Sequence, residues 1–450
     1  MAQTQPQAQQ EGHDVICIGF TPAAISLGIT LRESSPSTRI LFLEPRSKAT
    51  WKPLPDLPGH AHTSHNLLSD LVTLENPRSR FTFIQFLHQR KLLIDYTNLG
   101  SIQPPRNLFE DYLQWCAKHF QDNVHFGARV LAVEPVYSSR RKIDGWSIFT
   151  ENGSRKLYTA KQVVFCMSQQ PYMPSVLAKP ALLPGVVHSS QCMKQLSELT
   201  KPERKMVRIA IVGQTQAAAE LFNTLYDIRA DREVVWLVEQ SSLLPYTQSS
   251  LDANDGFSQA NPDLPPELRR AKANNAKATT TIVKSSLLDH IYENQYAQSI
   301  KEPDSSKWKY RIKFNQVITN AETASSGLVN LRHQDKTSNQ QVIDDFNMVI
   351  AATGFTRASL DNLLPSLSSK RLLDGSSITT NAEYAINLRR GVLEPGAGLW
   401  CVGSIGDEDV ATGEGAFSIM AERSVRVARS LKACRVVDEA QNSERVQAQL

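Results

Sequence analysis

The chain has few of the features that mark a disulfide-rich, membrane-spanning or nucleic-acid-binding protein. Its six cysteines are scattered among 450 residues and include no Cys-x-x-Cys pair, which argues against a zinc site and a disulfide framework. The 49 basic and 45 acidic residues nearly cancel, so no nucleic-acid partner is expected. No apolar run has the length of a membrane span. We therefore expect a cytoplasmic protein that binds neither nucleic acid nor membrane.

The length and apolar content are instead those of a large globular protein. The 450 residues, 41% of them apolar, are enough for two or three domains with a sizeable core. Residues 1–12 are Gln-rich and polar, without the basic start and apolar centre of a secretory signal, and we expect them to form a disordered tail.

A strand, a glycine turn, a helix and a second strand open the folded part. Residues 14–18 are apolar enough for a strand buried on both faces, and Gly19 begins the turn. Residues 25–31 indicate a helix, and residues 39–44 a strand that ends in Glu44. This order is typical of the first half of a dinucleotide-binding unit, whose strand-ending acid reaches a ribose hydroxyl.

The same pattern returns later in the chain. Residues 207–212 indicate a buried strand, Gly213 a turn, and residues 233–239 a second strand. Both units share one departure, because Thr21 and Thr215 stand where the second glycine lets backbone amides close on a pyrophosphate. We expect each threonine side chain to occupy space where the phosphate would lie, which weakens the prediction of a bound cofactor but not that of the fold.

The remaining pattern predicts that the second unit is inserted into the first. A buried strand over residues 345–355 ends in Ala-Thr-Gly, another covers residues 399–403, and a helix over residues 415–433 follows. The stretch 241–278 is long, polar and irregular, which is typical of a functional or disordered loop. We expect an α/β protein with two Rossmann-like dinucleotide-binding domains, the chain leaving the first sheet, building the second and returning.

Three histidines lie close together in the loop 59–66. Their spacing fits no standard metal-ligand pattern, and no cysteine or carboxylate cluster completes it nearby, so no metal is expected. They are interpreted either as part of a polar loop or, for His62 and His65, as pocket residues that move protons.

Several further segments are distinctive: 14–24, 42–44 with Trp51, 70–79, 81–83, 96–99, 109–116, 188–190 and 216–220. With the two nucleotide units and the Ala-Thr-Gly strand, they resemble the class B flavoprotein monooxygenases of the N-hydroxylating group, above all the L-ornithine N5-monooxygenases. In that family FAD lies on the first unit and NADPH on the second, NADPH reduces the flavin, and a side-chain amine takes an oxygen atom. The family often forms tetramers, and the resemblance therefore implies a homo-oligomer.

The resemblance implies a domain plan and a set of site residues. The plan is a tail over 1–12, an FAD-type domain over 13–185, an NAD(P)-type domain over 186–345 with the loop 241–278, the rest of the FAD-type domain over 346–435, and a tail over 436–450. The expected catalytic residues are His62, His65 and Glu414, and the expected substrate residues are Asn254 and Gly415. The expected cofactor-binding residues are Gly19, Thr21, Pro22, Glu44, Trp51, Val130, Gly213, Thr215, Gln216, Glu239, Gly354, Gly403, Thr412 and Gly413.

Several positions depart from the family pattern. The lysine that holds the ornithine carboxylate is missing from residues 60–64, so free ornithine has no evident counter-charge. The arginine that clamps the NADPH 2′-phosphate is replaced by Glu239, which repels a phosphate but suits the free hydroxyl of NADH. The C-terminal Ser-Asp-Ser is replaced by residues 413–415.

These departures leave three hypotheses. The first is a divergent N-hydroxylating flavoprotein monooxygenase of specialised metabolism, acting on a small amine other than free ornithine. The second is a non-redox enzyme for cyclisation or proton transfer, using His62 or His65. The third is an inactive paralogue that binds a partner.

Overall fold

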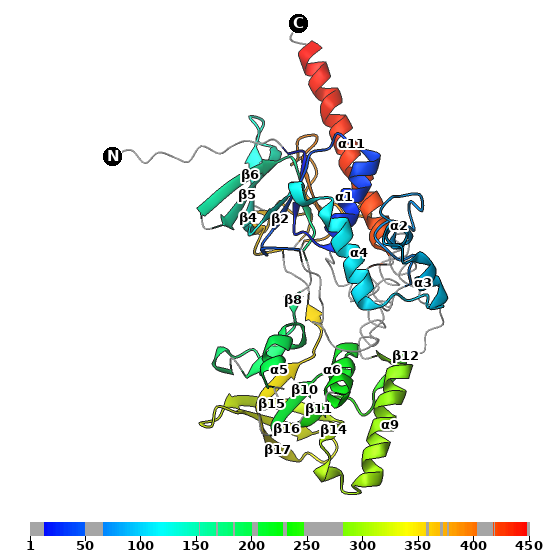
Figure 1. The fold of residues 1–450 in the computed structure, drawn as a ribbon. Coiled ribbons are helices and arrows are strands. Elements are labelled where there is room, and N and C mark those ends of the chain that lie inside the picture. The colour runs from blue at the N-terminus through cyan, green and yellow to red at the C-terminus, as the bar shows by residue number, and fades with distance from the viewer. Residues whose placement is uncertain are drawn as a thin grey trace.

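The structure is a computed structural model. It describes residues 13–49, 66–152, 154–167, 170–182, 185–199, 206–227, 232–246, 282–356, 360–369, 372–375, 378–402, 417 and 419–447. Two parallel sheets form the centres of two bodies, one above the other in Figure 1. No helix of these described residues is long and apolar enough to cross a membrane.

The first body is built on a five-stranded parallel sheet in the order β20-β7-β1-β2-β3. Its strands are β1 (Val15–Ile18), β2 (Ile40–Glu44), β3 (Val124–Phe126), β7 (Gln162–Phe165) and β20 (Gly398–Cys401). All four residues of β1, β7 and β20 are buried, as expected for strands covered on both faces.

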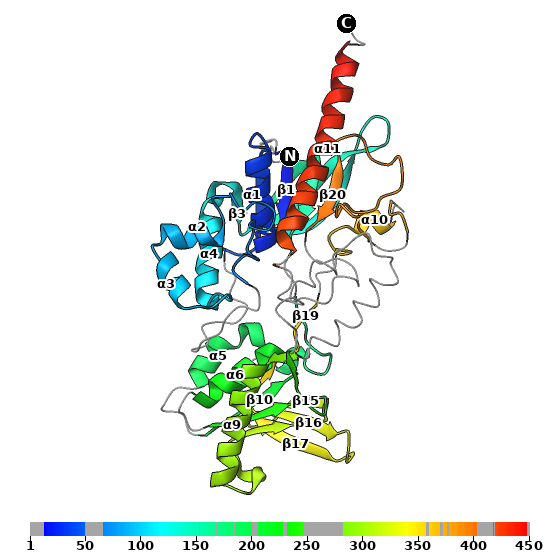
Figure 2. The ribbon, with the colours of Figure 1, turned by 90° about the vertical axis from the view of Figure 1, so that its right-hand side faces the viewer.

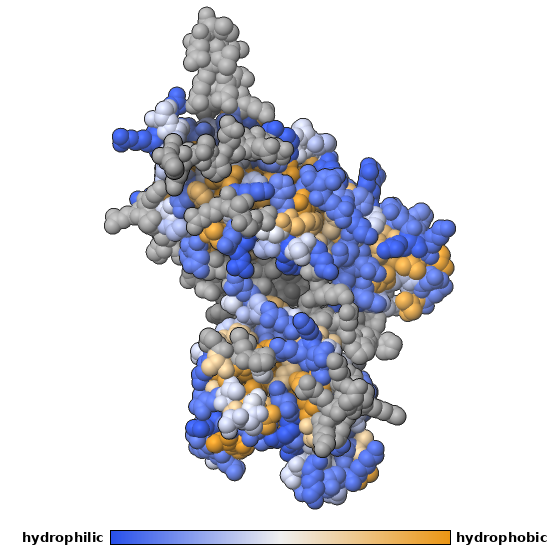
Figure 3. Space-filling model, turned by 60° about the vertical axis from the view of Figure 1, so that its left-hand side comes forward, coloured by the Kyte–Doolittle hydropathy of each residue, from blue (hydrophilic) through white to orange (hydrophobic). Residues whose placement is uncertain are grey.

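Two layers cover this sheet. On one face lie α1 (Pro22–Ser34), α2 (Phe83–Gln89), α3 (Leu93–Asn98), α4 (Arg106–Lys118) and α11 (Met420–Gln447), with η1 (Gln121–Asn123) beside them. Figure 2 shows α1 and α11 side by side. The other face packs on the antiparallel sheet β4 (Arg129–Tyr137), β5 (Ile143–Asn152) and β6 (Ser154–Ala160), and on α10 (Pro365–Ser369). Figure 3 shows apolar side chains gathered over α2 and α3, where Ile94 and Leu99 are exposed.

The second body repeats the arrangement with the strand order β14-β11-β10-β18-β9, all pairs parallel. Its strands are β9 (Val186–His188), β10 (Val207–Val212), β11 (Arg232–Leu237), β14 (Tyr310–Lys313) and β18 (Met348–Ala351). Alternate residues face opposite layers: Ile209 and Ile211 pack toward the helices, Ala210 and Val212 toward an antiparallel sheet.

The layers of the second body are likewise a helical one and a β one. The helices are α5 (Met193–Leu199), α6 (Gln216–Asp227) and α9 (Ser285–Lys301), with the short pair β12 (Leu244–Tyr246) and β13 (Ile282–Lys284) beside them. The antiparallel sheet is β15 (Gln316–Thr323), β16 (Val329–Asp335) and β17 (Gln341–Phe346). The turns η2 (Pro180–Leu182), η3 (Ser189–Gln191) and η5 (Ser305–Lys307) complete the described elements.

The topology confirms that the second unit is inserted into the first. All strands of the second sheet lie between β7 and β20, which are neighbours in the first sheet. Where the chain passes between the bodies, β8 (Gln170–Pro171) and β19 (Phe355–Thr356) pair antiparallel.

Three expectations about boundaries are corrected. Residues 346–352 were assigned to the FAD-type domain, but β18 pairs with β10 and β9, because this fully apolar run fills the centre of the second sheet. Residues 436–450 were expected to be a tail, yet α11 continues to Gln447, since no Gly or Pro interrupts it. The stretch 241–278 is not wholly irregular, because it contains β12.

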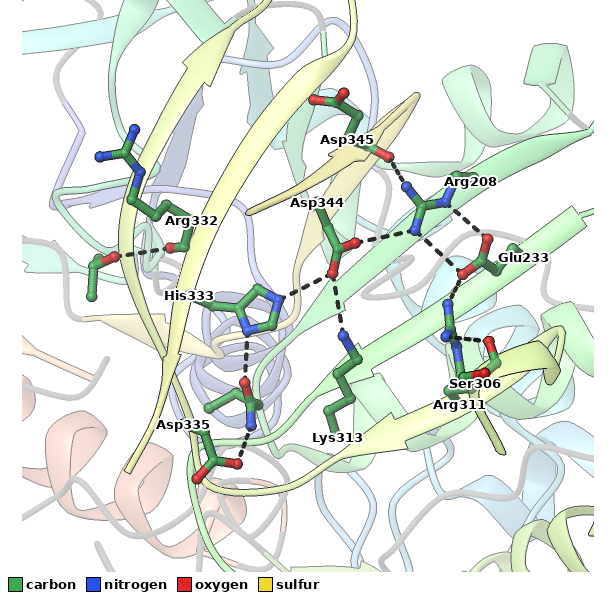
Figure 4. Close-up of polar contacts among 12 residues, drawn as sticks. Arg208, Glu233, Ser306, Arg311, Lys313, Arg332, His333, Asp335, Asp344 and Asp345 are labelled. Carbon is green, nitrogen blue, oxygen red and sulfur yellow. Dashed lines mark hydrogen bonds and ion pairs between the residues drawn. The ribbon is translucent and has the colours of Figure 1, made fainter. Parts of the chain in front are cut away.

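A network of charged residues joins the sheet β15–β17 to the second parallel sheet (Figure 4). Arg208 on β10 donates from Nε to Glu233 Oε2 at 2.8 Å and from Nη2 to Asp344 Oδ1 at 3.3 Å. Lys313 Nζ lies 3.2 Å from Asp344 Oδ2, and the buried His333 places Nε2 at the same distance from that oxygen. Arg311 pairs with Glu233 from the next strand. Asp344 on β17 is thus held by three cationic or imidazole groups from β10, β14 and β16.

Candidate functional site

The first glycine turn lies at the carboxyl end of β1. Gly19 has φ +98°, and a Cβ atom there would lie 2.8 Å from the Cys166 carbonyl oxygen, so only glycine fits. Thr21 follows as the N-cap of α1, and its side chain is buried. The Thr21 hydroxyl donates to Cys166 O at 2.8 Å and accepts from Ala24 N at 3.4 Å. Burial raises the pKa of the Cys166 thiol well above its usual range, so this residue acts here through its carbonyl.

The second glycine turn, after β10, has the same construction. Gly213 has φ +128°, and a Cβ atom there would clash with Ala352 O. The Thr215 hydroxyl donates to Ala352 O at 3.0 Å and accepts from Ala218 N at 3.3 Å. Cys166 and Ala352 occupy equivalent places, each one residue past the strand that neighbours β1 or β10. Both threonines therefore fasten a turn to the adjacent strand and cap the following helix.

This arrangement bears on whether a dinucleotide fits. Both tight glycine turns, which bring the backbone close to a pyrophosphate, are present. Each threonine hydroxyl accepts a hydrogen bond from an amide in the first turn of the following helix. A bound phosphate oxygen would accept from an amide at that same place. Pro22, at the first position of α1, has no N–H to offer. The turns thus have the shape of dinucleotide sites but fewer free donors.

Glu44 is positioned at the end of β2 beside the first turn. Its carboxylate is 2% exposed and accepts from Phe20 N at 2.8 Å. Arg46 donates to it from Nε at 2.6 Å, from its backbone N at 3.1 Å and from Nη2 at 3.3 Å. A ribose hydroxyl would have to exchange with the guanidinium of Arg46, whose side chain is 39% exposed. The Glu44 carboxylate therefore fits the ribose of a dinucleotide as a hydrogen-bond acceptor once Arg46 moves.

Glu239 lies two residues beyond β11, at the open end of the second sheet. Its side chain is 62% exposed, and Lys336 Nζ lies 2.8 Å from its Oε1. A cation therefore stands next to the carboxylate that we expected to repel the NADPH 2′-phosphate. That repulsion stays a prediction.

Gln216 and Gly354 both lie at the second turn. Gln216 begins α6, donates from Nε2 to Glu220 Oε1 at 3.0 Å and accepts from Lys284 N at 2.9 Å. Gly354 is one of the expected cofactor-binding residues, to which the first hypothesis assigns a role in holding FAD together with Gly19 and Glu44. It lies instead beside Thr215, because it follows β18 of the second sheet, and a Cβ atom there would lie 3.9 Å from Thr215 Cγ2.

The carbonyl of Gly354 accepts hydrogen bonds from two residues that lie near the place where the chain passes between the bodies. It accepts from Tyr172 N at 3.0 Å and from His188 Nε2 at 2.8 Å. Burial lowers the pKa of His188, while the bond to Gly354 opposes that shift. His188 Nδ1 in turn accepts from Ser190 N at 3.2 Å, which places the proton on Nε2.

The other expected site residues fall into two groups. Val130 lies on β4, half-buried against the core beneath the first sheet. The rest lie outside the residues that the structure describes: Trp51, His62, His65, Asn254, Gly403, Thr412, Gly413, Glu414 and Gly415. Within the described ranges no group of three or more His, Cys, Asp or Glu side chains is placed to hold a metal ion.

Sequence reasoning missed four residues. Arg46 and Lys336 contact Glu44 and Glu239, and Arg106 and Glu220 pair with each other. Arg46 could have been found, because an arginine two residues after a strand-ending acid is within reach of it. Lys336 and Arg106 are brought to their partners by the fold across long sequence separations, so no local pattern indicates them.

Comparison with known proteins decides the family. The family model described as L-lysine 6-monooxygenase/L-ornithine 5-monooxygenase matches residues 11–357, which include both glycine turns. The chain belongs to this monooxygenase family. The L-ornithine N(5)-monooxygenase of Ajellomyces capsulatus is similar, at 29% identity over 94% of this chain and 91% of that protein.

Solved structures agree on the fold of this monooxygenase family. The reduced form of the ornithine hydroxylase from Pseudomonas aeruginosa superposes with a TM-score of 0.81 at 25% identity, over 94% of this chain and 99% of that one. The ornithine N-hydroxylase of Kutzneria sp. 744, solved with reduced FAD, NADP+ and L-ornithine, gives a TM-score of 0.83 at 23% identity, over 94% and 100%.

Proposed function

We propose that the protein is a flavin-dependent monooxygenase that hydroxylates the nitrogen of a small amine other than free ornithine. The observation that carries this proposal is the family match across residues 11–357, which spans both nucleotide turns. Relatives matched over more than nine-tenths of the chain are ornithine monooxygenases, which supports an amine as the substrate class.

FAD would be held at the first turn and a nicotinamide nucleotide at the second. When bound, the flavin supplies the activated oxygen and the nicotinamide nucleotide the electrons. Gly19 and the start of α1 would face the FAD pyrophosphate, and Glu44 a ribose hydroxyl after Arg46 turns away. Gly213, Thr215, Gln216 and Gly354 would form the second cradle, to which Glu239 lends a preference for NADH over NADPH.

The choice of substrate rests on a charge that the chain lacks. Residues 60–64 contain no lysine, the residue type that the resemblance implies would hold the ornithine carboxylate. A carboxylate without a counter-charge binds poorly in a closed site. We infer a substrate whose carboxylate is absent or masked, with His62 or His65 taking the amine proton, Glu414 assisting, and Asn254 and Gly415 contacting the substrate.

The test begins with the visible spectrum of the purified chain titrated with FAD. We expect a flavin band, followed by NADH or NADPH oxidation that yields a hydroxylamine, detected by mass spectrometry. The amine panel would contain ornithine, ornithine amide, lysine and cadaverine, and the two amines without a free α-carboxylate, ornithine amide and cadaverine, should be favoured. Rapid hydroxylation of free ornithine would overturn the substrate proposal. Unchanged turnover in His62→Ala, His65→Ala and Glu414→Gln would remove the catalytic assignment.

A second candidate is non-redox chemistry, or binding alone, on the same scaffold. This candidate is favoured by the two threonine hydroxyls and by Arg46, because they already make hydrogen bonds at the turns and to Glu44 where the dinucleotides would bind. A colourless protein with no spectral change on adding FAD would select it.

A further inference from the structure

An ion pair crosses from the first body to the second beside the second glycine turn. Arg106 is the first residue of α4 in the first body, and Glu220 lies on α6 in the second. Arg106 Nη1 donates to Glu220 Oε2 at 3.0 Å, and Nη2 donates to Oε1 at 3.1 Å. The side chains are only 15% and 12% exposed. This is a bidentate pair largely shielded from water, the geometry in which an arginine–carboxylate contact is strongest.

The same carboxylate is connected to the nucleotide turn. Gln216 lies one helical turn before Glu220 and donates to Glu220 Oε1 at 3.0 Å. The amide oxygen of Gln216 accepts from the backbone N of Lys284, at the end of β13. A continuous path of hydrogen bonds therefore runs from α4 through Glu220 and Gln216 to β13. Gln216 directly follows Thr215, the residue that fastens the turn to Ala352.

Within the described residues, the pair is an attachment between the bodies in addition to the place where the chain crosses from one to the other. That crossing is the short ribbon in which Phe355 pairs with Pro171 and Thr356 with Gln170. One two-residue ribbon permits rotation of one body against the other, as at a hinge. A bidentate contact elsewhere on the interface removes that freedom. Hydride transfer between two bound cofactors requires reacting atoms within roughly 3.5 Å, so small rotations matter.

We propose that Arg106 and Glu220 are positioning residues that hold the second nucleotide turn at a fixed distance and orientation from the first body. Neither residue needs to touch a cofactor, because Glu220 acts through Gln216 and Arg106 through Glu220. The consequence for nicotinamide binding rests on the proposed function, whereas the consequence for the arrangement of the bodies does not.

The test compares the full chain with Glu220→Gln, Arg106→Gln and the charge-exchanged double variant Arg106→Glu/Glu220→Arg. The matched control is Arg426→Gln, which removes a 2.5 Å arginine–glutamate contact to Glu422 within α11 alone. Small-angle X-ray scattering without ligand reports the arrangement of the bodies. Titration calorimetry with NADPH, NADH and FAD reports binding at each turn.

We expect both single variants to broaden the distribution of interatomic distances and to weaken the tighter-binding nicotinamide nucleotide about tenfold, in line with the loss of a shielded charge pair. FAD binding should change less than twofold, because the first turn is untouched. The charge-exchanged variant should recover most of both effects, and the control should show neither.

Scattering curves identical to the wild type in both single variants would overturn the proposal. So would a loss of FAD and nicotinamide binding in equal measure, which would indicate general unfolding. If the wild type binds no nicotinamide nucleotide, the proposed redox function fails, while the scattering comparison still decides the role of the pair.

Discussion

At the scale of single residues, the two threonines are the clearest departure from a dinucleotide-binding pattern. Each hydroxyl donates to the carbonyl that follows the neighbouring strand and accepts from an amide of the helix that it caps. A glycine would leave that amide open to a phosphate oxygen. We therefore expect each threonine to stabilise its turn and to compete with a phosphate oxygen for that amide.

Thr21→Gly should bind FAD about tenfold more tightly, because one first-turn donor is released. The same change should lower stability by about 1 kcal/mol through the lost bond to Cys166. Fluorescence titration with FAD and thermal unfolding measure the two effects. Thr21→Ser is the control, since it keeps the hydroxyl and should behave like the wild type. Equal FAD affinity in the Gly and Ser variants would show that the hydroxyl does not compete with phosphate.

Glu239 should set the preference between the two nicotinamide nucleotides. Glu239→Gln removes an anion and frees Lys336, 2.8 Å away, to face a 2′-phosphate. We expect the ratio of Kd values to shift about fivefold toward NADPH, with a smaller shift at high salt because the site is exposed. Calorimetry with both nucleotides measures it. Glu322→Gln, an exposed glutamate on β15, should leave the ratio unchanged.

Arg232 is a buried charge for which the described residues offer no hydrogen-bond partner. It is 1% exposed at the start of β11, and none of its three guanidinium nitrogens has a hydrogen-bond partner within the described part of the chain. Burial lowers the pKa of Arg232, because removing the charged guanidinium from water costs free energy. Arg232→Met should therefore raise the free energy of unfolding by roughly 1–3 kcal/mol. Urea unfolding checks this, and Arg208→Met should do the opposite, because Glu233 and Asp344 would each lose one of their cationic partners.

At the scale of elements, the sheet β15–β17 is fastened to the parallel sheet by charge as well as by apolar packing. The hydrogen bond from His333 holds the pKa of Asp344 well below its usual range, and Lys313 and Arg208 act in the same direction against the effect of burial. When the pKa of a carboxyl is lower in the folded than in the unfolded protein, its charge stabilises the fold. That stabilisation is fully present at pH values above the unfolded pKa of about 3.9, and it is lost as the pH falls through the folded pKa.

Asp344→Asn should thus cost roughly 2 kcal/mol at neutral pH, and the difference from the wild type should shrink as the pH falls below about 4. Urea unfolding at a series of pH values measures this convergence. Asp345→Asn is the neighbouring control, because that carboxylate bonds only Asn330 among the described contacts. A difference that stays constant with pH would contradict the role given to the Asp344 charge.

The elements that the sequence predicts well are those whose signal is local. Both glycine turns and the buried strand before each of them follow from apolar runs and turn residues in the sequence. The prediction that β18 belongs to the first domain was wrong, because an apolar run does not indicate which of two sheets it joins. The partners of Glu44 and Glu239 were not predicted, since side-chain pairing depends on tertiary placement.

At the scale of the whole molecule, insertion of one body into the other makes the first body depend on the end of the chain. β20, which pairs with β7, follows all strands of the second sheet along the chain, and α11 after it packs on α1. Gln162 Nε2 on β7 donates to Leu431 O, and Trp400 Nε1 on β20 donates to Ser430 Oγ. The last helix therefore closes the first body over β7 and the edge strand β20.

Truncation should reveal where that closure ends along α11. A chain that stops after Ala440 keeps the buried Leu431 and the 2.7 Å contact between Lys161 Nζ and Asp438, and its Tm should stay within about 2 °C of the wild type. A chain that stops after Ala428 loses Leu431 and both hydrogen bonds to β7 and β20, which together cost several kcal/mol and should lower Tm by roughly 10 °C. Differential scanning calorimetry measures both. An equal loss from the two truncations would place the closure beyond Ala440, and no loss from either would mean that the first body is complete without the end of α11.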